Sequence, residues 1–489
     1  METNEALQTA LGQVAEAELL TLVKSLNELR AGDLKGLEER VLATAFAIGR
    51  GLLACLLSHH QPAERPAARR VGSCGHRQRL VGQRSKQLLT ALGKISFPRP
   101  YYQCVQEAAK QQAEGKEPRE PACSHGEAPA DALWGVQARR TSPKVQECVS
   151  YLAARLTLEE VAETFSRMLP LSMSARQVLT LMQPVGEALL AREDEHVSEL
   201  WEQAAQVRTE QAMEATAKQE SIDRLYIELD GVTARLRRGS VPMEEKEQKR
   251  SGDVYREVKV GAVFGASRGP ERSGLAPGVF VDEAGDKQYV ARRAKAEDFG
   301  KLLYALAADQ GLARAKQVVV LGDGARWIWR LVADHFAGAV QIVDLWHARE
   351  HVWKVARATF EPGTSEAVAW AEQACSLLVQ GKIEELVTEI AVLPMQLPEP
   401  GATRSVAEIE MDYFIANAAR MRYPAFRAQG LHVGSGIAEA ACKTVVSTRA
   451  KRCGMRWTPA GLDAVLALRT AVLNGSYDAF WQQQPRLVA

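Results

Sequence analysis

Hydrophobic positions in the second half of the chain predict two short buried strands with a helix between them. Residues 318–321 form an unbroken apolar run, bounded by glycines and too short for a buried helix, which predicts a strand buried on both faces. Residues 326–335 carry apolar side chains at helical spacing, and a second apolar strand covers residues 339–343. An acid follows each strand, first Asp323 and then Asp344. Acids at the carboxyl ends of strands are typical of binding sites in α/β sheets.

Three more strands are predicted before this stretch. Residues 223–231 alternate between apolar and polar side chains and end in Asp230 and Gly231. Asp-Gly is also a common hairpin turn, but the residues that follow stay strand-like. Later elements are predicted as strands at 255–264 and 287–294 and a helix at 296–308. The order β-β-β-α-β-α-β predicts an α/β domain with a mixed sheet, in which Asp230 lies beside Asp323 if the first and fourth strands are neighbours.

The rest of the chain has mainly helical patterns. Residues 5–57 predict a helical hairpin for packing or oligomerisation, and residues 361–430 predict a helical insertion into the α/β domain. A Gly-Ser-Gly turn then leads into a helix over 437–451, which carries Glu439 in its first turn. An acid at that position also fits ordinary complementarity to the helix dipole. A last helix is expected to begin after Thr458.

A helix-turn-helix candidate lies before the α/β domain. One helix is predicted over 158–168, and Ser174 caps a second helix that we expect to be interrupted near Pro184. In such a motif the N-terminal residues of the second helix, here Arg176 and Gln177, contact bases in the major groove. An ordinary helical hairpin fits the same pattern and is commoner.

Length and composition describe an ordinary globular protein. The 489 residues are enough for several domains and a large core. No apolar run reaches the roughly 18 residues needed to cross a bilayer, so no membrane contact is expected. The first ten residues are polar and acidic, unlike a secretory signal. Eight cysteines without regular spacing do not make a disulfide scaffold, which favours a reducing cytoplasm.

The formal net charge of +1 hides two basic tracts that contain no acid. The first consists of Arg65, Arg69, Arg70, Arg77, Arg79, Arg84, Lys86, Lys94 and Arg99. The second consists of Lys443, Arg449, Lys451, Arg452 and Arg456. Basic tracts in a neutral chain indicate contact with a polyanion, although most charge runs are only solvated surface.

Cysteine and histidine residues gather in the region before residue 130. The residues are Cys74, His76, Cys104, Cys123 and His125, and they flank a predicted hairpin over 87–104. Cys74, Cys104, Cys123 and His125 are a candidate zinc set. The region has no C-x-x-C pair, which favours a degenerate site or ordinary thiols over a loaded zinc.

Asp230, Asp323 and Glu439 are the candidate catalytic residues. Clustered carboxylates repel one another, so a site of this kind requires cations. Their oxygen ligands suit two hard divalent ions, Mg²⁺ or Mn²⁺, which stabilise the attacking and leaving oxygens of a phosphoryl displacement. Lys443 and Arg449, on the same late helix as Glu439, would hold phosphates.

The sequence from about residue 225 to 473 resembles the catalytic domain of Kra-type insertion-sequence transposases, which are distant relatives of Mutator-like elements. The matching blocks, in order and spacing, are LYIELDG, YREVKVGAVF, LGDGARWIW, IVDLWHAREHVW and GSGIAEAACKTVVSTRAKRCGMRW. A weaker match, TSPKVQECVSYLAARLTLEEVAETF, extends the resemblance to about residue 141.

This resemblance implies an RNase H-like DDE transposase in which Asp230, Asp323 and Glu439 hold two Mg²⁺ or Mn²⁺ ions. It also implies that His347, three residues after Asp344, contacts DNA or positions a phosphate; a buried polar pair at a strand end is the alternative. The other side chains expected on DNA are Lys443, Arg449, Arg452, Arg456, Arg176 and Gln177. Terminal inverted repeats and target DNA are the implied partners, with a homo-oligomer on paired ends in the bacterial cytoplasm, at the nucleoid.

The sequence departs at the cysteines from the family that it resembles. That family usually has paired cysteines in its N-terminal region, and Val71 and Glu107 stand where the partners of Cys74 and Cys104 are expected, which argues against bound zinc.

The expected organisation starts with mainly helical N-terminal domains and ends with the catalytic core. The expected parts are a helical region (1–60), a basic, degenerate zinc-ribbon-like region (61–130), a helical DNA-binding region (131–218), the catalytic domain (219–360 and 431–475), its helical insertion (361–430) and a tail (476–489). Two other functions fit the same residues. One is a domesticated or inactive transposase that binds DNA by sequence, and the other is a structure-specific nuclease without strand transfer.

Overall fold

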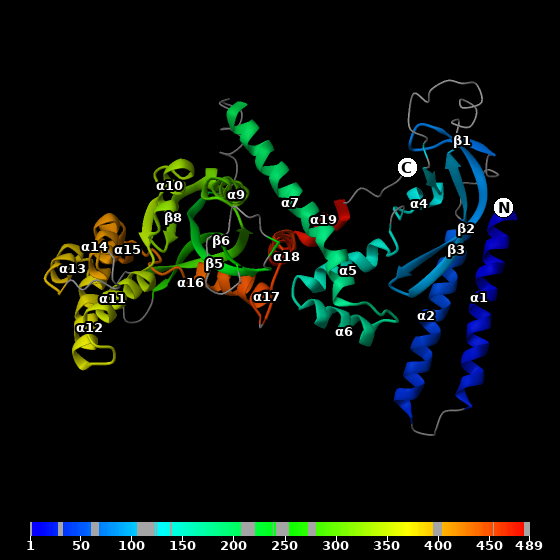
Figure 1. Cartoon of the computed structure of the whole chain (residues 1–489), viewed down its shortest axis with the longest axis horizontal. Coiled ribbons are helices and arrows are strands. Elements are labelled where there is room, and N and C mark those ends of the chain that lie inside the picture. The colour runs from blue at the N-terminus through cyan, green and yellow to red at the C-terminus, as the bar shows by residue number, and fades with distance from the viewer. Residues whose placement is uncertain are drawn as a thin grey trace. The chain divides into compact units, whose positions relative to one another are not determined.

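The chain divides into two compact units in the computed structural model. Unit 1 is Met1–Met182 with Tyr477–Ala489, and unit 2 is Gln183–Ser476. The structure describes residues 2–27, 33–59, 68–104, 123, 125–136, 139–206, 221–237, 239–240, 254–271, 280–394, 403–452 and 454–483. Figure 1 labels the elements of both units, which are described separately here. The boundary at Met182 lies inside the region expected at 131–218, and the regions expected at 1–60 and 61–130 both belong to unit 1.

Unit 1 combines helices with an antiparallel sheet. Its helices are α1 (Glu2–Leu26), α2 (Leu34–His59), α4 (Pro129–Leu133), α5 (Pro143–Ala153), α6 (Leu158–Met168), the start of α7 (Ala175–Gln206) and α19 (Tyr477–Gln483). Its strands, β1 (Arg69–Val71), β2 (Arg77–Thr90), β3 (Gly93–Cys104) and β4 (Gly126–Glu127), pair in the order β1-β2-β3-β4. The predicted hairpin is confirmed and is longer than expected, because exposed and buried side chains alternate along much of β2.

Helix α2 packs on the β2–β3 hairpin. Leu57 shares a small core with Leu88, Ile95 and Phe97, and Arg50 donates a hydrogen bond to the Leu92 carbonyl at 3.2 Å. By length and composition alone α2 is apolar enough to cross a membrane, which is weak evidence because core helices pass the same test. The sequence predicted no membrane-spanning run, because Arg50 interrupts the apolar residues of this segment. The helix itself continues through Arg50, so it is long enough to pass the test.

Part of the first basic tract is internal. The buried Lys86 and Arg99 both contact Asp131, which is also buried, at 3.0 and 2.7 Å. Asp131 comes from α4, beyond the tract, so the count of charges along the sequence missed the acid that neutralises them. Arg77, Arg79 and Arg84 of β2 remain exposed.

The helix-turn-helix candidate has the predicted helices. Helix α6 begins and ends at the predicted residues, after a capping box formed by Thr157 and Glu160. Ser174 and Gln177 form the same reciprocal pair at the start of α7, with hydrogen bonds of 2.8 and 3.3 Å. Helix α7 continues through Pro184, contrary to expectation. A proline removes one backbone hydrogen bond, and buried side chains on both sides of it hold the helix together.

Unit 2 is a mixed sheet covered by helices. Its strands are β5 (Ile222–Leu236), β6 (Val254–Glu271), β7 (Phe280–Arg292), β8 (Ala315–Gly322) and β9 (Val340–Val343). They pair in the order β7-β6-β5-β8-β9, with β5, β6 and β7 antiparallel and β8 and β9 parallel to β5. The predicted order β-β-β-α-β-α-β is confirmed by α9 (Ala296–Asp309) and α10 (Arg326–His335).

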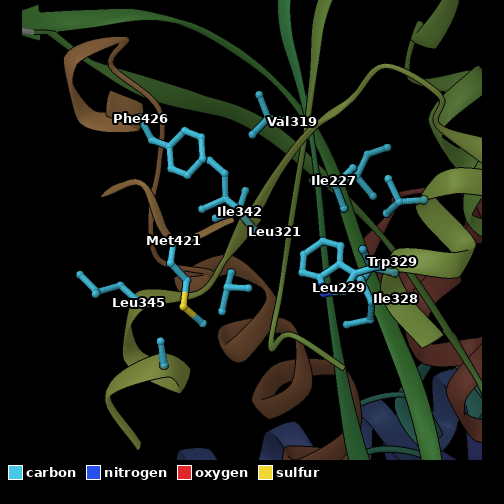
Figure 2. Packing of buried hydrophobic residues seen from close by; sticks show 14 of the residues in the cluster. Ile227, Leu229, Val319, Leu321, Ile328, Trp329, Ile342, Leu345, Met421 and Phe426 are labelled. Carbon is cyan, nitrogen blue, oxygen red and sulfur yellow. The ribbon is translucent and has the colours of Figure 1, made fainter. Parts of the chain in front are cut away.

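The helical insertion belongs to the core of unit 2. It follows α11 (Leu345–Thr359) and consists of α12 (Ser365–Val379), α13 (Ile383–Ala391), α14 (Val406–Asn417), a 3-10 turn η3 (Ala418–Met421) and α15 (Tyr423–Ala428). Figure 2 shows Met421 and Phe426 of the insertion in the same cluster as Ile342 of β9 and Leu321 of β8. The insertion is therefore packed on the sheet edge and is not a separate body.

The last helices return over the sheet. Helix α16 (Gly436–Ala441) continues through a π-helical turn (Cys442–Ser447) into α17 (Thr448–Ala450), and α16 contacts β5 and β6. Helix α18 (Pro459–Leu473) begins as predicted, because the Thr458 hydroxyl accepts a hydrogen bond from the Gly461 N–H at 3.1 Å.

Candidate functional site

Asp230 lies in β5 of unit 2, and Asp323 directly follows β8, the neighbouring strand parallel to β5. Glu228 of β5 is paired in register with Leu321 of β8, so Asp230 and Asp323 follow at equivalent positions two residues further along. Both are half-buried, and each accepts a backbone hydrogen bond, from Gly231 at 2.7 Å and from Ala325 at 2.8 Å respectively. Burial raises the pKa of Asp323, and the charge of Asp230 raises it further. Two carboxylates that repel each other in this way favour a bound cation.

Helix α14 supports the turn that carries Asp323. Gly324 has a φ of 94°, and a Cβ there would lie 2.6 Å from the Tyr413 ring. The Tyr413 hydroxyl donates to the Asp323 carbonyl at 2.8 Å. Buried Asn417 donates to the Gly324 carbonyl at 3.3 Å and accepts from the Trp329 indole at 2.8 Å. The insertion thus donates hydrogen bonds to two successive carbonyls of this turn, those of Asp323 and Gly324.

Asp344 holds His347 next to these acids. Buried Asp344 accepts hydrogen bonds from the His347 N–H at 2.7 Å, from its ring Nδ1 at 3.2 Å and from the Ser435 hydroxyl at 2.8 Å. Burial by itself would raise the pKa of Asp344, but the hydrogen bonds from His347 and Ser435 outweigh it and lower this pKa.

His347 is consequently a cation at neutral pH. The hydrogen bond to Asp344 raises the pKa of His347 to about 9, against the opposing effect of burial, and the charges of Asp230 and Asp323 add to the rise. Asp344 and His347 thus form a polar pair at the strand end, in which Asp344 is buried, the His347 side chain is 29% exposed, and the charges of Asp230 and Asp323 act on His347.

Glu228 is a buried acid that the sequence did not single out. It lies two residues before Asp230, is fully buried, and accepts a hydrogen bond from the Ala438 N–H of α16 at 2.8 Å. Burial raises the pKa of Glu228 to about 8. Strand alternation places Glu228 on the face of Asp230, and that was the available signal. The strand has buried residues on both faces, so this acid became internal.

Glu439 lies on α16 but does not join the two aspartates directly. Its exposed carboxylate accepts from Lys443 at 2.6 Å. Cys442, on the same helical run, lies beside Asp230: burial raises the pKa of this thiol, and the Asp230 carboxylate raises it further. Among the described residues, the three acids do not form a group with ligand atoms within 4.8 Å of one another. The structure therefore brings the helix of Glu439 to β5 while its side chain points to Lys443.

The predicted DNA contacts differ in their exposure. Lys443, Arg452 and Arg456 are exposed, as are Arg176 and Gln177. The side-chain oxygen of Gln177 accepts a hydrogen bond from the Ser174 N–H at the start of α7. Arg449 is a correction: its side chain is 1% exposed and its guanidinium lies 5.0 Å from the Trp457 ring centre. An arginine packed in this way supports the π-helical run from inside and is not placed to reach a phosphate.

Three of the four candidate zinc residues of unit 1 converge, but the histidine that joins them is not the predicted one. Cys74, Cys104 and Cys123 converge, and their histidine neighbour is His76. His125 lies outside this group and contacts Ser73 and Glu127 instead. The hydrogen bond from the His76 backbone lowers the pKa of Cys74 to about 6, whereas burial raises the pKa of Cys104 to about 11.

A cavity of about 430 Å³ lies near the other end of β5 and β8. Four of its charged residues form two ion pairs, Lys316 with Asp223 at 2.6 Å and Arg224 with Asp282 at 2.5 Å, and Arg268 also lines it. It contains none of the candidate site residues that the sequence singled out.

Comparisons with known proteins identify no relative. No protein-family model matches the chain, and no curated protein matches it.

Proposed function

We propose that this protein is a DNA transposase of the DDE type, which cleaves transposon ends and joins them to target DNA. The proposal is carried by one observation: Asp230 of β5 and Asp323, just after the parallel strand β8, each lie two residues beyond the paired residues Glu228 and Leu321, and the helix of Glu439 packs on β5. The strand order β7-β6-β5-β8-β9, with β5 central, is the order expected of an RNase H-like core and supports the family resemblance.

The donor set fits divalent cations. Asp230 and Asp323 offer carboxylate oxygens in a half-buried setting, where the charge of Asp230 raises the pKa of Asp323. Glu439 would complete the set by leaving Lys443. An exposed helical ion pair of this kind contributes only about 0.5 kcal/mol, so the rotation is inexpensive. Two Mg²⁺ or Mn²⁺ ions, when bound, would activate the attacking oxygen and stabilise charge on the leaving oxygen.

His347 and its neighbours would hold the DNA strand. A protonated imidazole fixed by Asp344 can donate to a phosphate oxygen next to the acids. Trp346 is 61% exposed and has the Arg349 guanidinium 5.2 Å from its ring centre, a surface suited to an unpaired base and its phosphate. Lys443, Arg452 and Arg456 extend this basic surface along the chain.

The arrangement of unit 1 suits end binding by an oligomer. Arg77 and Arg79 are exposed on β2, and Arg176 is exposed at the start of α7. Leu19, Leu20 and Val23 of α1 are at least half exposed, so this helix retains an apolar surface for a second copy. We place such an assembly in the cytoplasm, on paired terminal repeats.

The test uses the DNA that flanks the reading frame. Purified full-length protein with Mg²⁺ is expected to nick this DNA at the element ends and to join pre-cut ends to a plasmid. Asp323→Asn removes one ligand charge and is expected to reduce nicking at least a hundredfold. Asp309→Asn changes an acid paired at the surface with His196 and serves as the matched control, expected to retain activity. Undiminished nicking by Asp323→Asn would remove this residue from the mechanism.

A second function is favoured by the pairing of Glu439 with Lys443. If that pair persists on DNA, the chain binds DNA as a domesticated transposase without cutting it. Gel-shift binding of the flanking DNA, with no Mg²⁺-dependent product, would support this alternative. Nicking without joined products would instead indicate a structure-specific nuclease.

A further inference from the structure

Four soft ligands from separate parts of unit 1 meet at one point. The ligand atoms of Cys74, His76, Cys104 and Cys123 all lie within 4.8 Å of one another. The sulfurs of Cys74 and Cys104 are 3.3 Å apart, and those of Cys123 and Cys104 are 3.5 Å apart. A tetrahedral zinc with bonds of about 2.3 Å sets its sulfur ligands roughly 3.8 Å apart, so the cluster already has nearly the required spacing.

A tight turn presents two of these ligands. Cys74 and His76 flank Gly75, whose φ of 76° is in the left-handed region. The Gly72 N–H donates to the His76 carbonyl at 2.9 Å, and the Gly75 N–H donates to the Gly72 carbonyl at 3.0 Å. The turn therefore directs Cys74 and His76, which are separated only by Gly75, into the same cluster without a C-x-x-C motif.

The opposite side of the cluster is fixed by the sheet. Cys104 ends β3, and its N–H donates to the His125 carbonyl at 2.9 Å, which places the chain that carries Cys123 beside it. Gln78, fully buried on β2, directs its side-chain N–H group at the sulfurs of both Cys74 and Cys104, each at 3.9 Å. Amide donors aimed at sulfur stabilise thiolates, the form that binds metal.

The donor chemistry selects the metal. Three sulfurs and one imidazole nitrogen suit Zn²⁺, whereas Mg²⁺ prefers oxygen ligands. Binding would release the thiol protons to solvent and leave a net charge of −1 on the metal centre.

We propose that Cys74, His76, Cys104 and Cys123 bind one structural Zn²⁺ ion that ties the β1–β2 turn to the end of β3. The metal closes a cross-link between segments thirty and more residues apart, where β1 and β4 are only three and two residues long. Short strands contribute little pairing energy of their own, so the ion stabilises this end of the sheet. The site lies in unit 1 and does not depend on the activity proposed for unit 2.

The test measures metal directly in the full-length protein. Protein expressed with added Zn²⁺ and purified under reducing conditions is expected to contain one zinc per chain by mass spectrometry. His76→Ala is expected to weaken zinc at least tenfold in a chelator competition, and Cys104→Ser to abolish its binding. His125→Ala and Cys148→Ser, a histidine and a thiol outside the cluster, are the matched controls and should keep one zinc.

A second measurement does not require any variant to fold. Alkylation mapped on the natural protein should spare Cys74, Cys104 and Cys123 until a chelator is added, and should label Cys148 equally before and after. Protein without zinc after reconstitution would overturn the proposal. Zinc loss in His125→Ala with retention in His76→Ala, or recovery of a Cys74–Cys104 disulfide in place of metal, would also overturn it.

Discussion

At the scale of single residues, the site is a balance of charges held close together. Asp230 of β5 lies close enough to Asp323, just after β8, for its charge to act on Asp323, and His347 supplies a positive charge fixed by Asp344. Hydrogen bonds keep Asp344 ionised despite its burial, because the donors of His347 and Ser435 lower its pKa. An imidazolium in this position partly neutralises the aspartates before any metal or phosphate arrives.

His347 makes the stability of unit 2 depend on pH. Its folded pKa of about 9 lies above the unfolded value of about 6.5. The stabilisation is therefore fully present below about pH 6.5 and is lost as the pH rises through 9. We expect His347→Gln to lower the free energy of unfolding by up to about 3 kcal/mol more at pH 6 than at pH 10. Urea unfolding followed by tryptophan fluorescence measures this difference.

The partner of His347 provides the control. In an Asp344→Asn background the same His347→Gln change should have almost no pH-dependent effect, because the main cause of the raised pKa is gone. Equal losses at pH 6 and pH 10 in the natural background would show that the pair contributes nothing through its charge.

At the scale of elements, the insertion completes the site. Helix α14 reaches the Asp323 turn through Tyr413 and Asn417, and its neighbours η3 and α15 add Met421 and Phe426 to the core. The turn needs this support because Gly324 adopts a left-handed conformation. An element that appears in the sequence as an interruption of the α/β pattern thus helps to position an acid of the site.

Asn417→Ala tests the support of the Asp323 turn. The change leaves the buried Trp329 indole N–H and the Gly324 carbonyl without their partner. Each such loss costs about 1–3 kcal/mol, so we expect unit 2 to lose about 2–4 kcal/mol in urea unfolding. Hydrogen exchange at the Ala325 amide, which Asp323 holds, should accelerate.

The matched control is Gln373→Ala, which removes an exposed side chain that donates a hydrogen bond to Glu389 of the same insertion. It should change stability by less than about 0.5 kcal/mol. If both variants behave alike, α14 does not hold the turn.

At the scale of the whole molecule, the two units offer two kinds of candidate metal ligands. Unit 1 has sulfur and imidazole ligands at one end of its sheet, and unit 2 has carboxylates at the ends of parallel strands. A ligand stabilises only the unit that binds it, in proportion to the logarithm of its concentration. The two proposed sites can therefore be tested in one experiment.

Calorimetry of the full chain should resolve two unfolding transitions. A zinc chelator is expected to lower one of them by several degrees, and millimolar Mg²⁺ to raise the other. His76→Ala should remove only the chelator effect, and Asp323→Asn only the Mg²⁺ effect. If chelator and Mg²⁺ move the same transition, the assignment of one metal to each unit is wrong.

The sequence by itself determined the local structure of this protein. Helix α10 begins and ends at the predicted residues because its apolar positions recur at helical spacing, and α6 begins after Thr157 because a capping box needs only residues three apart. The strand alternation before Asp230 and the apolar run before Asp323 also placed both acids in the right elements. Periodicity and capping depend on neighbours a few residues away, so they can be read without knowing the fold.

Only the tertiary structure decided which side chains meet. His76 and not His125 faces the three cysteines, Arg449 is buried against Trp457, and Glu439 pairs with Lys443. Each outcome depends on how strands pair and which helix covers them, over separations that no local pattern spans. The same packing neutralised Lys86 and Arg99 with an acid that lies outside their tract. Residue types and spacing limit which ligands and charges are available, and long-range packing decides which of these side chains come together.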